Sequence, residues 1–379
     1  MTRNRDEDSC PGALTLHRAA DGALARVRLP GGAITAAQLA ALARISTEFA
    51  SPALELTSRG NIQIRGIPDT AAATSAVADA IADAGLLPSP THERVRNIVA
   101  SPLSGRSGGL ADVRHSVIAL DRAIQAEPVL AALPGRFLFA VDDGRGDVTN
   151  LAADAGVQFV DADSAALLLA GRDTGVRLPA ADVVAALIDV AVRFVAARGT
   201  AWRVAELADT GALLAGAAPV PDVTAGAAPV PGGVGRPPVG WIEQDDGRIA
   251  LGAAVPLGVL QARVAEFLAA IEAPLVITPW RSVLVCDLDE GVADVALRVL
   301  APMDLVFDET SPWLSVSACT GSPGCEHSAA DVRADAALAV RTPSPVHRHF
   351  VGCERACGSP PAGEVLVATD DGYQRRVRD

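Results

Sequence analysis

The chain contains the same strand, helix and strand pattern twice, and this duplication is its strongest constraint on the fold. Residues 21–67 read "DGALARVRLPGG", then "TAAQLAALARISTEFA", then "LELTSRGNIQIRGI". Residues 246–288 repeat this order with "DGRIALGAAVPLG", "VLQARVAEFLAAI" and "LVITPWRSVLVCDL". The copies start about 220 residues apart, whereas the units of a solenoid run roughly 20 to 50 residues. The pattern therefore predicts a duplicated two-domain unit.

The spacing of apolar residues supports these element types. Five apolar residues of the second copy recur at steps of three and four, the period of a helix with one buried face. They are Leu257, Leu260, Val264, Phe267 and Ile271. The segment after each helix alternates apolar and other residues, Ile62 with Ile64 in one copy and Val283 with Val285 in the other, which predicts strands.

Length and composition limit the class of protein. At 379 residues the chain exceeds the usual domain of about 100 to 200 residues, so we expect at least two domains. Residues 210–238 contain "AGAAPVP" twice and are dense in Ala, Gly and Pro, which predicts a linker. The net charge of −13 argues against a nucleic-acid partner, because a polyanion needs a basic surface.

The sequence also predicts a cellular location. The opening "MTRNRDEDSCPGA" is charged and lacks the apolar stretch of a secretory signal. Apolar stretches such as "DVVAALIDVAVRFVAA" contain Asp and Arg and fall short of the roughly 18 apolar residues of a membrane helix. We therefore expect a cytoplasmic protein with no membrane partner. In a reducing compartment, clustered cysteines hold metals or do redox work more often than they form disulfides.

Four of the six cysteines lie in two short runs near the C-terminus. Five residues separate Cys319 from Cys325 and three separate Cys353 from Cys357, with glycines beside them. Thiolates suit soft metals, and glycine lets the backbone fold tightly around a cluster. These spacings favour a four-iron four-sulfur cluster over zinc, whose knuckles use shorter pairs, and two disulfides are a third alternative.

The other two cysteines are interpreted as structural or incidental. Cys286 lies in "SVLVCDL", where a free cysteine behaves as a small buried hydrophobic residue. Cys10 precedes a proline in a polar segment, and a lone terminal cysteine is more often incidental than functional.

At the cysteines the chain resembles a known superfamily. "ACTGSPGC" and "GCERACG" resemble the cluster signature of the sulfite and nitrite reductases, and "LTSRGNIQIRGI" and "LVITPWRSVLV" resemble their strand-turn-strand signatures. The resemblance implies an α+β, duplicated fold in which two ferredoxin-like half-domains pair by pseudo-twofold symmetry beside two α/β cofactor-binding domains. The implied boundaries are 1–68 and 239–300 for the half-domains, 69–209 for the first α/β domain, 210–238 for the linker and 301–379 for the cluster domain.

One branch of the superfamily fits the chain best. The reductases are longer, and the opening "CPGALTLHRAADGALARVRLPGG" and closing "EVLVATDDGYQRRV" resemble the precorrin-3B synthases of aerobic cobalamin biosynthesis. The resemblance implies a monooxygenase that hydroxylates precorrin-3A with dioxygen and closes a ring-acetate lactone. It implies a four-iron four-sulfur cluster, a mononuclear non-haem iron, and NADH as the indirect source of electrons. The alternatives are a siroheme-dependent sulfite or nitrite reductase and a non-catalytic tetrapyrrole-binding or electron-transfer protein.

The resemblance also implies a set of substrate-binding residues. Precorrin-3A, like siroheme, is a partly reduced tetrapyrrole with eight carboxylates, and arginine binds carboxylates in a bidentate manner. The matching positions are Arg59, Arg96, Asn97, Arg136 and Arg281. The reductases have a second basic residue where this chain has Leu138, and its loss favours a tetrapyrrole substrate over a small oxyanion.

No residue is identified as catalytic from the sequence. In "VHRHF", His347 and His349 alternate on an expected strand and so share a face, which makes them candidate ligands of the non-haem iron or ordinary polar neighbours of the cluster. No Gly-x-Gly-x-x-Gly opens a helix, so we expect a separate reductase or ferredoxin to deliver electrons.

Overall fold

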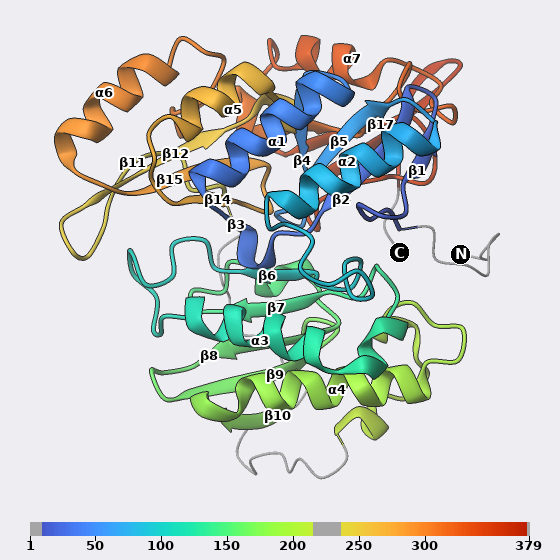
Figure 1. Ribbon diagram of the computed structural model, residues 1–379, viewed down its shortest axis with the longest axis vertical. Coiled ribbons are helices and arrows are strands. Elements are labelled where there is room, and N and C mark those ends of the chain that lie inside the picture. Colours follow the sequence, from blue (N-terminus) through green and yellow to red (C-terminus); the bar gives the residue numbers. More distant parts are fainter. Residues whose placement is uncertain (1–9, 215–235, 377–379) are drawn as a thin grey trace. The chain divides into compact units, whose positions relative to one another are not determined.

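The computed structural model describes residues 10–214 and 236–376 (Figure 1). Most of the predicted linker, residues 215–235, lies outside the described residues. The described residues form two compact units. One comprises the described parts of Met1–Gly12, Arg28–Gly32 and Pro88–Arg236, and the other the described parts of Ala13–Val27, Ala33–Leu87 and Pro237–Asp379.

The larger unit contains two five-stranded sheets that correspond to the two sequence copies. The first has the order β1-β2-β5-β4-β13 and the second the order β11-β12-β15-β14-β3. The strands of the first are β1 (His17–Ala19), β2 (Gly22–Val27), β5 (Ile62–Ile67), β4 (Ala53–Leu56) and β13 (Val259–Gln261). The strands of the second are β11 (Gly240–Glu243), β12 (Ile249–Ala254), β15 (Ser282–Leu288), β14 (Leu275–Ile277) and β3 (Ala33–Ile34).

The two sheets exchange their last strands. The short strand β3 comes from the first copy but pairs with β14 of the second, with Ile34 opposite Leu275. Equally, β13 comes from the second copy but pairs with β4 of the first, with Leu260 opposite Leu54. Each half-domain therefore completes the other half's sheet, and the ferredoxin-like halves form the pseudo-twofold pair that the resemblance implies.

Helices cover these sheets. They are α1 (Ala36–Phe49), α2 (Ala71–Asp83), α5 (Ala262–Ala269) and α6 (Glu290–Leu300). A capping box starts α1: Thr35 Oγ1 accepts the N–H of Gln38, and the Gln38 side chain accepts the N–H of Thr35. The corresponding helices α1 and α5 pack against each other, as Figure 1 shows in blue and yellow.

The helix predicted from the period of residues 257–271 is shorter than expected. It begins at Ala262, and Leu260 lies in β13 instead. Phe267, placed on the buried face by the period, is 38% exposed. The prediction was wrong here because the segment before Ala262 is taken up by pairing with β4, a contact with a strand about 200 residues earlier.

The smaller unit holds an α/β domain whose sheet has the order β10-β9-β8-β7-β6. Its elements are β6 (Ile98–Ala100), α3 (Arg114–Ala126), β7 (Phe139–Asp142), β8 (Ala155–Phe159), β9 (Ser164–Leu169), β10 (Arg172–Pro179) and α4 (Val183–Ala197). Strands β6, β7 and β8 are parallel, and β9 runs antiparallel to β8. Phe137, Phe139 and Phe194 meet in the core, with ring centroids 4.9 and 5.0 Å from that of Phe137.

The C-terminal part of the chain repeats this topology within the larger unit. Its elements are β16 (Val316–Ala318), α7 (Val332–Ala339), β17 (Arg348–Val351), β18 (Glu364–Thr369) and β19 (Gly372–Arg375). Strands β16, β17 and β18 are parallel, and β19 runs antiparallel to β18. Strands β6, β7, β8 and β9 of the smaller unit have the same directions in the same order. The duplication thus includes the α/β domains. Among the described helices, none has the length and apolar character needed to cross a membrane.

Candidate metal centre

The two cysteine runs begin where two adjacent parallel strands end. Cys319 directly follows β16, and Cys353 follows β17 after one glycine. The strands are in register, with Ala318 opposite Phe350, and the N–H of Cys319 donates to the carbonyl of Phe350 at 2.9 Å. Because carboxyl ends of parallel neighbours meet at one sheet edge, both loops start at the same place.

The four sulfurs lie close together. All six cysteines are free thiols in the structure, and none forms a disulfide there. Burial raises the pKa of Cys319, and the thiols of Cys325 and Cys353 raise it further. Partial desolvation likewise raises the pKa of Cys357, and the other three sulfurs add to the effect. The raised pKa values favour the neutral thiol form of Cys319 and Cys357, and a nearby cation would favour their thiolates.

The backbone folds tightly around these sulfurs. Cys319 Sγ accepts the N–H of Gly352 at 3.4 Å. A Cβ at Gly352 would collide with Ser328 Oγ, and a Cβ at Gly321, whose φ is +71°, would lie 2.6 Å from Val332 Cγ2. Both positions therefore require glycine, because a larger residue would push the loops away from the sulfurs.

This donor set fits an iron–sulfur cluster better than zinc. Within residues 10–214 and 236–376, no three His, Cys, Asp or Glu side chains are grouped so that they could share a single metal ion. The thiolates of a cubic cluster each bind a different iron atom, so they stand farther apart than the ligands of one zinc ion. Four neighbouring thiols with backbone N–H groups directed at sulfur suit the cluster.

A buried chain of hydrogen bonds supports the second loop. Ser317 Oγ lies 2.8 Å from His347 Nε2 and 2.7 Å from His349 Nδ1. His349 is fully buried, and its Nε2 donates to the carbonyl of Cys357 at 3.0 Å. His347 Nδ1 lies 3.2 Å from the carbonyl of Leu314. The two imidazoles share a face as predicted, but all four ring nitrogens are hydrogen-bonded within the protein, so the pair anchors Cys357.

Arg281 lies beside this second loop. One terminal nitrogen donates to the carbonyl of Gly358 at 3.0 Å. Burial, together with the neighbouring Arg333 guanidinium, lowers the pKa of Arg281 to about 10, so it stays charged at neutral pH. Arg281 and Leu56 both border Gly258. A Cβ added to Gly258 would lie 2.7 Å from Arg281 Cδ and 3.0 Å from the carbonyl oxygen of Leu56. The side chain therefore reaches the end of β4.

The turn that carries Arg281 matches a turn in the other half. In residues 57–61 the N–H of Thr57 donates to the carbonyl of Asn61 at 2.9 Å, and the N–H of Gly60 donates to the carbonyl of Thr57 at 3.2 Å. In residues 278–282 the N–H of Thr278 donates to the carbonyl of Ser282 at 2.9 Å, and the N–H of Arg281 donates to the carbonyl of Thr278 at 3.1 Å. Arg281 thus takes the place of Gly60, and both have positive φ, +57° and +66°. This conformation costs a residue with a Cβ roughly 1 to 2 kcal/mol.

Arg59 lies in the matching turn of the first half, between β4 and β5. It is half-buried, and its N–H donates to Thr57 Oγ1 at 3.3 Å. The equivalent residue of the second half is Trp280, whose N–H donates to Thr278 Oγ1 at 3.3 Å. The two predicted site arginines therefore do not occupy equivalent positions, although both lie in the larger unit.

The three remaining predicted residues lie in the smaller unit. Arg96 is buried and donates through two nitrogens to both carboxylate oxygens of Asp121, at 2.7 and 2.9 Å. Asn97 is buried, and its amide donates to the carbonyls of Arg94, Gly135 and Phe137 at 3.0, 2.9 and 3.3 Å. Both side chains are therefore engaged in holding the segment before β6.

Arg136 is exposed and lies over an aromatic ring. Its guanidinium carbon is 5.1 Å from the centroid of the Trp202 ring, a cation–π contact. Leu138, which takes the place of the second basic residue of the reductases, is buried, and its N–H donates to Asp154 Oδ2 at 2.9 Å.

Sequence reasoning missed a partly buried polar row in the first half-domain. Arg26, Gln63 and Glu55 lie side by side on β2, β5 and β4, and Gln63 contacts both of its neighbours. Glu55 then accepts a hydrogen bond from Arg333 of α7 at 2.6 Å. On β5, Arg65 also lies near Glu55, with Nε 3.8 Å from its carboxylate. The sequence feature that could have revealed this row is the presence of charged residues on strands whose opposite face is apolar.

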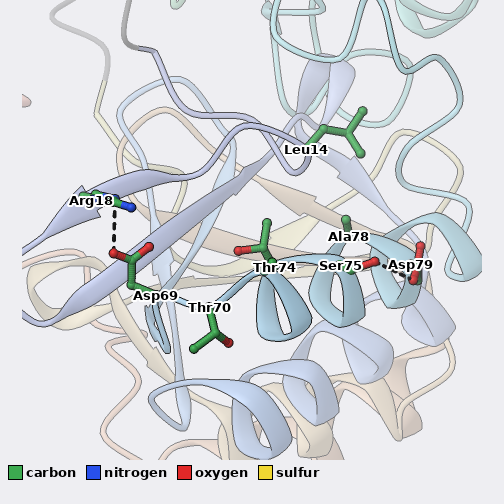
Figure 2. Close-up of a pocket in the computed structure, with 9 residues that line it drawn as sticks. Leu14, Arg18, Asp69, Thr70, Thr74, Ser75, Ala78 and Asp79 are labelled. Carbon is green, nitrogen blue, oxygen red and sulfur yellow. Dashed lines mark hydrogen bonds and ion pairs between the residues drawn. The ribbon is translucent and has the colours of Figure 1, made fainter.

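A hollow of about 500 Å³ lies at the start of α2 (Figure 2). It is lined by Leu14, Arg18, Asp69, Thr70, Ala71, Thr74, Ser75, Ala78 and Asp79. Its ion pair, Arg18 to Asp69 at 3.1 Å, joins side chains that are 83% and 51% exposed, so it contributes little. None of the predicted site residues lines this hollow.

Comparison with known proteins agrees with this geometry. A family described as the nitrite/sulfite reductase ferredoxin-like half domain matches residues 17–78. A protein named precorrin-3B synthase from Sinorhizobium is 27% identical over 392 aligned positions, which cover 96% of this chain and 81% of that protein. A ferredoxin–nitrite reductase of Synechococcus elongatus is 31% identical over 133 positions, covering 32% of this chain and 25% of that protein.

The fold is shared with a solved structure, the NirA protein of Mycobacterium tuberculosis. The two superpose with a TM-score of 0.77 at 21% identity, covering 93% of this chain and 73% of that one. The half-domain match lies in the first of the two sheets that exchange strands. Residues 17–78 are thus similar to the ferredoxin-like half domain of the nitrite and sulfite reductases, and the chain as a whole shares the fold of the NirA protein.

Proposed function

We propose that this protein is a precorrin-3B synthase, an iron–sulfur monooxygenase that hydroxylates precorrin-3A with dioxygen and forms the ring-acetate lactone. The observation that carries the proposal is similarity along almost the whole chain to a protein of that name, whereas the similarity to a nitrite reductase covers a third of the chain. As a monooxygenase it would place one oxygen atom in the product and release the other as water, using two electrons from NADH through a separate reductase or ferredoxin.

The cysteines provide the electron-transfer part of this activity. Cys319, Cys325, Cys353 and Cys357 would hold a four-iron four-sulfur cluster, which supplies single electrons when bound. The chain contributes the sulfurs, the N–H of Gly352 directed at Cys319, and the histidine anchor on Cys357. The expected non-haem iron is assigned no ligands, because the rings of His347 and His349 are engaged in hydrogen bonds.

The arginines provide the affinity for a substrate with eight carboxylates. Arg59 and Arg136 are the proposed carboxylate partners, since guanidinium forks match carboxylates in geometry and charge. Arg96 and Asn97 support the segment before β6 through Asp121 and three carbonyls. Leu138 removes one cation that anion reduction would use, which supports a substrate larger than nitrite or sulfite. The expected cytoplasmic location belongs to this proposal.

The second candidate is a siroheme-dependent sulfite or nitrite reductase. The half-domain match and the partial similarity to a ferredoxin–nitrite reductase favour it, because both are named for that class. A tetrapyrrole-binding or electron-transfer protein without catalysis is the third candidate, and it differs from the first only in turnover.

One anaerobic preparation distinguishes the three. Iron, acid-labile sulfide and tetrapyrrole are measured on the same sample, and the visible spectrum is recorded. A precorrin-3B synthase shows about four sulfides and about five irons, four for the cluster and one for the non-haem site, with no siroheme, and converts precorrin-3A only when dioxygen and an electron donor are added. Stoichiometric siroheme with nitrite or sulfite reduction supports the second candidate, and binding of precorrin-3A without conversion supports the third.

A further inference from the structure

We propose that Arg65 and Arg281 are positioning residues for the cluster loops, and that each ferredoxin-like half contributes one of them to one loop. Arg65, from the first half, donates to the carbonyl of Gly324 at 2.8 Å, and Gly324 directly precedes Cys325. Arg281, from the second half, donates to the carbonyl of Gly358, which directly follows Cys357. The inference rests on the proposed function only in that the four cysteines bind a cluster.

Arg65 is held rigidly at its contact with the first loop. Its Nε and one terminal nitrogen donate to the carboxylate of Asp21 at 3.0 and 2.8 Å, and the residue is only 8% exposed. A Cβ on Gly324 would stand 2.8 Å from Thr320 Cγ2 and 3.1 Å from Asp21 Oδ2. The glycine is thus packed directly onto the Asp21–Arg65 pair, and the loop cannot move away without breaking a charge-assisted hydrogen bond.

Arg281 occupies a position where the other half uses glycine. The turns at 57–61 and 278–282 have the same hydrogen bonds, so nothing in the turn itself requires a side chain at the fourth position. The chain nevertheless places arginine there in a left-handed conformation. Strained residues that persist in this way cluster at functional sites. The guanidinium at Gly358 is the contact that this conformation makes possible.

Two hydrogen bonds fix the backbone of the second loop at Cys357 and Gly358. His349 donates to the carbonyl of Cys357 and Arg281 donates to the next carbonyl, that of Gly358. A Cβ on Gly358 would lie 2.6 Å from the Arg281 terminal nitrogen and 3.9 Å from His349 Cε1. The carbonyls of the two successive residues Cys357 and Gly358 are therefore each held by an N–H donor, which fixes the backbone that carries the Cys357 thiol.

Both arginines also place positive charge next to the cysteine loops. The potential of an iron–sulfur cluster depends on net charge and on hydrogen bonding around its sulfurs. Loss of either guanidinium is expected to move the midpoint potential to a more negative value, because a nearby cation stabilises the reduced, more negative cluster. Outer contacts of this kind change metal retention by about 10- to 100-fold, so iron release to a chelator should become on the order of tenfold faster.

The main test compares Arg281→Gly with Arg248→Gly. Arg248 is an exposed arginine of the same half, so the control removes the same charge without touching a cysteine loop. Glycine accepts the left-handed turn, so Arg281→Gly should keep or raise the thermal midpoint while it lowers the cluster potential and speeds iron release. Arg281→Lys, which keeps the charge, should restore part of the potential. Wild-type potential and iron release in Arg281→Gly would overturn the proposal.

Hydrogen exchange of the cluster-free protein provides a test that needs no cluster. Faster deuterium uptake at residues 353–359 in Arg281→Gly, with wild-type uptake in Arg248→Gly, supports the proposal, and equal uptake in both overturns it. If the wild-type protein assembles no cluster at all, the proposed function fails while this exchange result still decides the positioning role. For the first loop, Asp21→Asn loosens Arg65 without emptying its site; uptake at 319–326 should rise, and unchanged uptake would remove Arg65 from the proposal.

Discussion

Ser101 Oγ occupies in the first α/β domain the position that Cys319 Sγ occupies in the second. Each residue directly follows the first parallel strand, and each N–H donates to the carbonyl of the neighbouring strand, at 3.3 Å for Ser101 and 2.9 Å for Cys319. Each side chain then accepts a backbone N–H from that neighbour's following loop: Asp143 to Ser101 at 3.1 Å and Gly352 to Cys319 at 3.4 Å. This backbone arrangement, here called the cradle, is therefore present in both α/β domains, but only the second carries a thiol at this position.

The first α/β domain fills this cradle with carboxylates instead of sulfur. Asp142 accepts hydrogen bonds from the N–H groups of Gly144, Gly146 and Val148, among others, and Asp143 pairs with Arg145 at 2.7 Å. These carboxylates are occupied by the backbone and by arginine, so the polar loop closes on itself. This replacement leaves residues 101–148 without a cysteine.

Replacing any of the four cluster cysteines with serine should abolish the iron–sulfur content. An alcohol is a harder and far less acidic ligand than a thiol, and the mutual positions of the four sulfurs leave no spare ligand. The control is Cys286→Ala, since Cys286 is fully buried on β15 and lies outside the two cysteine runs. Iron and sulfide analysis checks this, and a serine variant that kept full iron and sulfide would overturn the site assignment.

Replacing His349 with alanine should destabilise the cluster-free protein by about 1 to 3 kcal/mol, because the Cys357 carbonyl loses its His349 donor and Ser317 Oγ keeps only His347 of its two histidine partners. Urea unfolding of the apo-protein measures this. His115→Ala, an exposed change on α3, should leave the midpoint unchanged. Equal midpoints for both variants would contradict the anchoring role of His349.

Replacing Arg96 with glutamine should act on stability before it acts on substrate. Arg96 and Asp121 form a buried ion pair, and removal of one partner leaves a buried charge at a cost of about 3 to 5 kcal/mol. Combining Arg96→Met with Asp121→Leu should recover most of that loss. If the Arg96→Gln protein unfolds at the wild-type urea concentration but binds tetrapyrrole more weakly, the arginine contacts substrate instead.

Asp147 should make the smaller unit less stable as pH rises from about 4 to about 7. Burial raises the pKa of Asp147 to about 7, although Ser101 donates to it and opposes the shift. Because the folded state then binds more protons than the unfolded state, the stabilisation is complete below the ordinary pKa near 3.8 and is lost as pH passes 7. Asp147→Asn should flatten this dependence in urea unfolding at pH 5, 6 and 8; an unchanged slope would contradict it.

Much of the site was predictable because its signals are local. Cys319, Cys325, Cys353 and Cys357 were identified from spacing and neighbouring glycines, and the structure brings their sulfurs together. The alternation in "VHRHF" placed two histidines on one face, which the structure confirms. Their hydrogen-bond partners, Ser317 and the Cys357 carbonyl, were not predictable because they come from other segments.

The sequence by itself determined the duplicated order of strands and helices, and it predicted the cysteine ligands and the resemblance to the superfamily, since periodicity, spacing and motif are properties of neighbouring residues. The tertiary structure alone decided that β3 and β13 exchange sheets, that Arg281 matches Gly60 instead of Arg59, and that Arg65 reaches the loop at Gly324. Each of these depends on segments hundreds of residues apart. Such contacts are selected by the packing of whole sheets, and the local sequence carries no record of their partners.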